Sequence, residues 1–307
     1  MKKRSLFIAS LILIFLFGAI YLIKNIPSKV SIFDGARAYK DVTEQVGFGS
    51  RIPQSIAHQE TVSYITQQLK NAGWNYAIKT QVFEDHIATN ILAMRNSDYP
   101  SILLGAHYDS RISADHDPDP TKRSLPVPGA NDGASGVAVL LELARVLPQN
   151  SIPVSLVFLD LEDNGNLPGW NWIIGSNAFA ASLTEKPKVV IILDMVGDKN
   201  LNIFMEKNSD SRFTKQIWNS ANSLGYRKYF IPSYKYQVLD DHIPFIESGI
   251  PSLDIIDLDY PYWHTSEDTP DKVSGQSLKI VGETLLKWIT SYGPCIQAEN
   301  CPDTSQK

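Results

Sequence analysis

Cysteine is nearly absent from this sequence, whose 307 residues include only Cys295 and Cys301. The two lie close together near the C-terminus, and no histidine lies beside them. Two thiols without a nearby imidazole make at most half of a zinc site, so a cysteine-based metal site is disfavoured. In an oxidising compartment they predict a local disulfide instead.

An excess of positive charge is also missing. The net charge is −5, and the sequence has no stripe of basic residues and no motif that reads nucleic acid. This charge balance argues against a nucleic-acid partner. It is compatible with substrates that carry a positively charged amine.

Several catalytic motifs are absent as well. The sequence has no GxGxxG, no P-loop, no GxSxG and no HExxH pair. Their absence argues against a dinucleotide-binding domain, a P-loop enzyme, a serine hydrolase of the α/β class and a zincin. Internal repeats and low-complexity stretches are also missing, and 43% hydrophobic with 20% charged residues is ordinary globular composition.

The sequence has one long apolar run without charge, residues 6–23, which follows a basic cluster at 1–4. Eighteen residues reach about 27 Å in a helix, enough for a short membrane span. Because the basic residues come first, the N-terminus is expected in the cytoplasm and the rest of the chain outside it. No small-x-small site follows the run, so an anchor is favoured over a signal peptide, whose cleavage would make the domain secreted.

The predicted organisation follows from these features. It comprises a membrane anchor or signal segment at 1–24, a linker at 25–45, an α/β domain at 46–293, and a tail at 294–307 with a Cys295–Cys301 disulfide.

Strands and helices alternate through the predicted domain. Near-continuous apolar runs, such as 154–159 and 189–193, are typical of strands buried on both faces. The sequence therefore predicts an α/β three-layer sandwich, with a mostly parallel central sheet and helices on both faces. The expected strands are 77–83, 90–94, 101–105, 154–159, 189–193, 201–205 and 252–256, and the expected helices are 55–72, 137–147, 213–224 and 278–288.

Polar residues stand where the predicted strands end. His107 follows the strand at 101–105, and Asp132 lies in a turn of small residues before the helix at 137–147. The loop between them is long, and long loops in compact domains are usually functional. Open α/β sheets bind ligands at the carboxyl ends of their strands.

Other strand ends carry similar side chains. Any one of them could be an ordinary turn residue, but five such ends in one sheet favour a site. Carboxylate oxygen and imidazole nitrogen together are what divalent metals such as zinc bind. These further candidates are Glu162, Asp163, Asp194, Asp240, Asp241, His242 and His264.

For His58, and for Asp241 from the set above, the sequence also indicates a structural role without a part in the site. His58 lies beside polar residues on the helix predicted at 55–72 and is expected at the surface. Asp241 precedes a turn and is a candidate helix N-cap.

Six blocks of the sequence resemble one known superfamily, which unites co-catalytic zinc aminopeptidases with glutaminyl-peptide cyclotransferases. The blocks are GAHYDSR, GANDGASGVAVLLELAR, FLDLEDNG, ILDMVGD, DDHIPF and WHTSEDT, in this order within 105–269. The loop ADHDPD, Trp263 directly before His264, and the pair Asp240-Asp241 look most like bacterial glutaminyl cyclases.

The resemblance implies a metal site. Zinc would be held by Asp132, Asp163 and His264. A second zinc, as in the aminopeptidases, would use His107 and Asp194, with Asp132 bridging. Many members have Glu-Glu where this chain has Glu162-Asp163; because aspartate is one methylene shorter, the backbone must approach the metal more closely.

The resemblance also implies roles for other side chains. Glu162 would be the general acid and base, and Asp194 and Asp240 would position the substrate amine and the tetrahedral intermediate. The indoles of Trp170, Trp172 and Trp263 would line the substrate pocket and exclude water.

Three functions are carried forward. The leading one is a zinc-dependent glutaminyl-peptide cyclotransferase, which converts the N-terminal glutamine of peptides to pyroglutamate, releases ammonia and needs one zinc. The alternative is a two-zinc aminopeptidase, and the remote alternative is a non-catalytic binding ectodomain. Either enzyme would act on peptide or protein N-termini; the sequence leaves the oligomeric state open.

Overall fold

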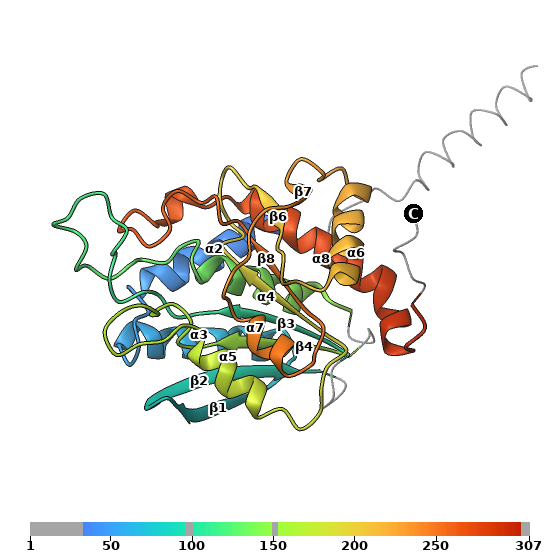
Figure 1. Cartoon of the computed structure of the whole chain (residues 1–307), viewed down its shortest axis with the longest axis horizontal. Helices are drawn as coiled ribbons and strands as arrows, with labels where there is room; N and C mark the ends of the chain where they lie inside the picture. Colours follow the sequence, from blue (N-terminus) through green and yellow to red (C-terminus); the bar gives the residue numbers. More distant parts are fainter. Residues whose placement is uncertain (1–32, 96–100, 149–152, 302–307) are drawn as a thin grey trace, which may run out of the picture. The chain divides into compact units, whose positions relative to one another are not determined.

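A six-stranded sheet forms the centre of the domain (Figure 1), in the order β1-β2-β4-β3-β5-β8. A computed structural model describes residues 33–95, 101–148 and 153–301. The strands are β1 (Asn75–Phe83), β2 (His86–Met94), β3 (Ile102–His107), β4 (Val154–Leu159), β5 (Val189–Asp194), β6 (Ile203–Met205), β7 (Phe230–Tyr234) and β8 (Ser252–Ile256). The helices are α2 (Gly35–Gly47), α3 (Ile56–Asn71), α4 (Ala134–Val146), α5 (Ile174–Ala181), α6 (Ser211–Ser223), α7 (Ile243–Glu247), η1 (Pro270–Lys272) and α8 (Gly275–Gln297).

The sheet is mostly parallel, as predicted. Strands β4, β3, β5 and β8 run parallel to one another, and every residue of these four is buried. Strands β1 and β2 form an antiparallel hairpin whose two turn residues, Glu84 and Asp85, both have positive φ. Positive φ at both turn positions suits the right-handed twist of a hairpin.

Helices cover both faces of the sheet. Alternate side chains of a strand point to opposite faces, and the apolar side chains of the central strands divide accordingly between two clusters. Leu103 and Val190 pack with Phe179 of α5 and Phe245 of α7. The residues that alternate with them pack against α2, α3, α4 and α8. The predicted three-layer architecture is thus confirmed.

Helix α2 corrects the predicted linker. It begins inside the segment predicted as linker and continues to Gly47, and Asp34 caps it by accepting the N–H groups of Ala36 and Arg37. The fully buried Glu142 of α4 accepts the N–H of Asp34 at 3.0 Å and two hydrogen bonds from Arg37 at 2.7 Å. The linker prediction is therefore wrong from the start of α2 onward, since a buried carboxylate and apolar packing hold this segment on the domain.

The other terminal boundary also differs. Helix α8 continues beyond the predicted end at 293 to Gln297, and a disulfide joins Cys295 to Cys301, the pairing that the sequence predicted. None of the described helices is long and apolar enough to cross a membrane. The predicted anchor at 6–23 lies outside the described residues and remains a prediction.

Glu142→Ala tests whether α2 belongs to the domain. The substitution removes the acceptor of three hydrogen bonds from residues 34 and 37, two of them from the Arg37 guanidinium, and of one from Arg145 at 3.3 Å. We expect a loss of about 2–3 kcal/mol in the free energy of unfolding, measured by urea denaturation. Glu44→Ala, at an exposed position of α2, should change it by less than about 0.5 kcal/mol. Equal effects of the two substitutions would contradict the attachment.

Candidate metal centre

The candidate site lies where the parallel strands end. His107 is the last residue of β3 and Asp194 the last of β5, while Glu162 and Asp163 follow β4. His264 lies in the loop after β8. Parallel strands present their carboxyl ends at one edge of the sheet, which brings these side chains together as the sequence predicted.

Asp132, Asp163 and His264 form the first cluster. His264 Nε2 lies 2.9 Å from Asp163 Oδ1 and 3.7 Å from Asp132 Oδ2. One ligand atom from each residue lies within 4.8 Å of the others, and all three residues are buried. Throughout the described chain, His264 Nε2 and one oxygen of each carboxylate find no hydrogen-bond partner. Buried polar atoms normally have partners, so these converging atoms suit a shared metal ion.

His107, Asp132 and Asp194 form a second cluster beside the first. His107 Nε2 lies 3.2 Å from Asp132 Oδ1 and 3.1 Å from Asp194 Oδ1. These three residues also satisfy the geometry of a metal site. Asp132 belongs to both clusters, one oxygen to each, as a bridging carboxylate would.

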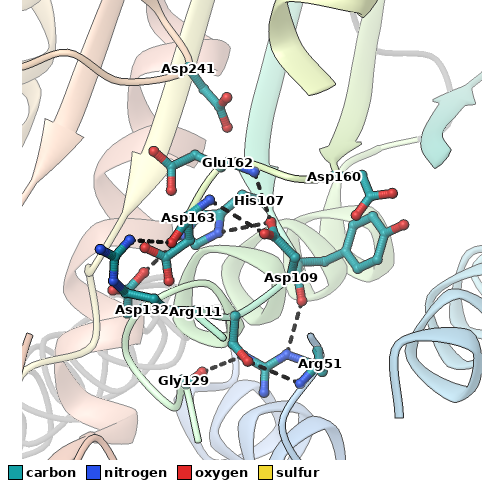
Figure 2. A network of polar contacts seen from close by, with 12 residues as sticks. Arg51, His107, Asp109, Arg111, Gly129, Asp132, Asp160, Glu162, Asp163 and Asp241 are labelled. Carbon is teal, nitrogen blue, oxygen red and sulfur yellow. Dashed lines mark hydrogen bonds and ion pairs between the residues drawn. The ribbon is translucent and has the colours of Figure 1, made fainter. Parts of the chain in front are cut away.

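Asp109 orients the residues around it, and it was not predicted as a site residue from the sequence. Its Oδ1 lies 3.4 Å from His107 Nδ1, and its carboxylate accepts the backbone N–H groups of Glu162 and Asp163 at 3.2 and 3.4 Å (Figure 2). The close hold on this backbone explains how the shorter Asp163 still reaches the cluster. The only signal in the sequence is a second acid two residues after His107.

The turn that carries Asp132 is held by two further residues. Asp268 accepts the N–H groups of Asn131 and Asp132 at 2.9 and 3.1 Å. The buried guanidinium of Arg51 donates to the carbonyls of Tyr108 and Gly129 at 2.9 and 2.6 Å (Figure 2). Sequence reasoning missed both, because their partners lie far away in the chain.

Burial controls the protonation of the site. It raises the pKa of Glu162 well above its usual range, and the nearby carboxylates of Asp163 and Asp240 raise it further. Burial raises the pKa of Asp194 to about 7, although the hydrogen bond with His107 acts in the opposite direction. It lowers the pKa of His264 to about 4, so this ring is neutral near pH 7, the form that binds metal.

A cavity of about 220 Å³ opens onto the clusters. Its lining includes Glu162, Asp240 and the two indoles of Trp172 and Trp263, together with residues of both clusters. Five of the six predicted catalytic and pocket residues, all except Trp170, thus line one cavity.

Trp170 does not belong to this lining. It stacks on His86 at a ring distance of 4.0 Å and lines a separate pocket with His58. The prediction that Trp170 lines the substrate pocket is therefore not met. Trp170 packs against Leu161 and Ile174, whereas Trp172 turns toward His264 at 5.8 Å.

Two structural interpretations also need correction. His58 is buried, with 7% of its surface exposed, because its Nε2 contacts Asp160 Oδ1 at 2.7 Å. The N-cap of α7 is His242 and has no side-chain cap bond. Asp241 is fully buried instead of capping the helix, and in Figure 2 its carboxyl group lies on the Glu162 side of the site.

Known proteins with a similar sequence and fold support a metal site at this position. The sequence matches the model of Peptidase family M28 over residues 90–289. Tannerella forsythia glutaminyl cyclase is 34% identical with a TM-score of 0.79, over 84% of this chain and 99% of that chain. A Zn-dependent exopeptidase from Parabacteroides distasonis has the same identity and TM-score, over 84% and 98% of the two chains. Aminopeptidase YwaD of Bacillus subtilis is 28% identical over 252 residues, which are 75% of this chain and 50% of YwaD.

The fold and the two clusters define an α/β metalloenzyme with its site at the carboxyl edge of a parallel sheet. The chain belongs to peptidase family M28, among zinc-dependent enzymes. It spans about half the length of YwaD and almost the whole of the cyclase structure.

His264→Ala tests the first cluster. It removes one of three candidate ligands, so zinc affinity should fall by more than the roughly 10–100-fold that changes outside the ligand shell cause. Competition with a chromogenic chelator measures this affinity. His86→Ala, which alters a histidine outside both clusters, should leave it unchanged. Parental affinity in His264→Ala would exclude His264 as a ligand.

Proposed function

We propose that this protein is a zinc-dependent glutaminyl-peptide cyclotransferase, which closes the N-terminal glutamine of a peptide to pyroglutamate and releases ammonia. The observation that carries the proposal is the cavity, whose lining combines Glu162 and Asp240 with two indoles and the first cluster. At about 220 Å³ it is smaller than the roughly 300–1,000 Å³ of most small-molecule pockets. This size suits a single side chain more than a run of peptide.

In this proposal Asp132, Asp163 and His264 hold the zinc. The bound ion would polarise the side-chain carbonyl of the substrate glutamine as a Lewis acid. The neutral ring of His264 and the converging carboxylate oxygens are the chemical basis for this assignment.

Glu162 moves the proton. Its carboxylate takes a proton from the substrate α-amine, whose nitrogen then bonds to the side-chain amide carbon. The carbon–nitrogen bond to the leaving group breaks, and Glu162 returns the proton to the departing ammonia. A group that both accepts and donates works best when its pKa lies near the working pH, which the upward shift at Glu162 favours.

The remaining residues bind and shield the substrate. Asp194 and Asp240, which line the cavity, present carboxyl groups that would orient the amine. Trp172 and Trp263 form the apolar part of the wall and would limit the access of water. Exclusion of water favours internal attack over hydrolysis.

The second cluster supports one alternative. With a second ion held by His107, Asp132 and Asp194, the same site would suit a two-zinc aminopeptidase. Asp194 would then be a ligand instead of a positioning group. The two proposals differ in metal count and in the product formed.

A peptide that begins with glutamine separates the two reactions. The protein reconstituted with zinc should lower the mass of this peptide by one ammonia, with no free amino acid released. Glu162→Gln should lower the rate at least about 100-fold, because the proton carrier is lost, while zinc content stays unchanged. Glu185→Gln, an exposed surface site, is the control. Release of the first residue instead would favour the aminopeptidase.

The two half-buried tryptophans of one loop form a matched pair. Trp172→Ala should lower kcat/KM for the glutamine peptide about 10-fold, equivalent to about 1.4 kcal/mol in transition-state stabilisation. Trp170→Ala should leave kcat/KM within about twofold, since Trp170 contacts His86 instead of the cavity. Steady-state kinetics with ammonia detection measures both, and a larger effect at Trp170 would reverse the assignment.

A further inference from the structure

The candidate ligand His264 has a strained backbone that a distant loop holds in place. Its φ is +56°, a left-handed conformation that costs a non-glycine residue on the order of 1–3 kcal/mol. The backbone N–H of His116 donates to the carbonyl of His264 at 3.2 Å. The carboxylate of Asp117 accepts the N–H and hydroxyl groups of Ser266 at 3.0 and 2.6 Å. Residues 115–117, here called the clamp, thus hold the turn at 264–266.

The clamp also faces the ring of His264. Nδ1 of this ring is buried and has no hydrogen-bond partner in the described part of the protein. Asp115 Oδ1 lies 3.7 Å from it. When a neutral histidine binds metal through Nε2, Nδ1 carries the proton and needs an acceptor. Asp115 is placed to be that acceptor.

Asp115 is itself fixed by Arg111. Nε of Arg111 donates to Asp115 Oδ1 at 2.7 Å and Nη2 donates to Oδ2 at 2.8 Å. Such a two-point pair holds a carboxylate in one orientation. Nη1 of the same arginine donates to the carbonyl of Asp163 at 2.7 Å, and its guanidinium lies 5.0 Å from the Trp172 ring. One buried side chain thus connects the clamp, a second candidate ligand and the pocket wall.

We propose that Asp115 is a positioning residue that accepts the Nδ1–H of His264 and thereby sets zinc affinity. The proposal rests on the ligand role proposed above for His264, and is independent of which reaction the enzyme catalyses. Asp115, His116 and His264 also satisfy the geometry of a third metal cluster. An additional cation there would have to displace the positive charge of Arg111 from both oxygens of Asp115, so the orienting role is favoured.

The test compares three substitutions in the full chain. Asp115→Ala removes the acceptor, and Asp115→Asn retains the shape and one oxygen but loses the charge. Asp119→Ala is the control, since its carboxylate lies in the same loop and accepts hydrogen bonds from the backbone N–H and hydroxyl of Thr121. Chelator competition gives zinc affinity, and the visible spectrum of the Co²⁺-substituted protein reports ligand geometry.

Zinc affinity should fall about 10–100-fold in Asp115→Ala, as for other residues that orient metal ligands. The loss in Asp115→Asn should be smaller, both spectra should change, and Asp119→Ala should match the parent. A purely structural role would lower the unfolding temperature of the metal-free protein without altering the affinity or spectrum of the folded fraction.

Parental affinity and spectrum in Asp115→Ala would overturn the proposal. If that variant does not fold, the same readings on Asp115→Asn decide it. The proposed function fails separately. If the parent binds zinc but does not cyclise a glutamine peptide, the reaction is wrong while the affinity loss in the Asp115 variants still supports the positioning role.

Discussion

Buried carboxylates at the carboxyl edge of the sheet must be compensated by positive charge or hydrogen-bond donors, and the rest of this structure depends on this constraint. Asp132, Asp163, Asp194 and Glu162 converge there with little contact with water. Burying a carboxylate is unfavourable unless a cation or hydrogen-bond donors compensate its charge. Burial alone would lower the pKa of His107, yet its contacts with Asp109, Asp132 and Asp194 raise it well above its usual value. The site therefore favours a cation at the position where a metal would bind.

Residues with a strained backbone lie at or beside the charged residues of the site. Leu161, Met195 and His264 all have positive φ. The first two adjoin Glu162 and Asp194, and the third is itself a candidate ligand. Left-handed conformations in such residues persist only when the surrounding structure imposes them, and they gather at functional sites. Here the buried strands and the hydrogen bonds of Asp109 and the clamp supply that support.

The same residues can serve two chemistries. Asp132 has one oxygen toward each cluster, the arrangement that both the one-zinc and the two-zinc proposals require. The cyclase proposal rests on the pocket beside the clusters, with its small volume and its two indoles. The loop at 163–173 contributes Trp172 to the wall of this pocket, whereas Trp170 of the same loop lines a separate pocket.

The sheet, its parallel core and the identity of the strand-end residues could be predicted from sequence alone, because buried strands need continuous apolar runs and their polar ends stand out against them. The cysteine pair could be predicted in the same way. The residues that support the site became visible only in the folded chain. Arg51, Asp109 and Asp268 act through partners distant in the chain. Helix α2 was not predicted, because the hydrogen bonds that attach it are accepted by Glu142 of another helix. Packing likewise determines which pocket Trp170 and Trp172 each line and why His58 is buried. Local sequence does not specify which neighbour a side chain contacts.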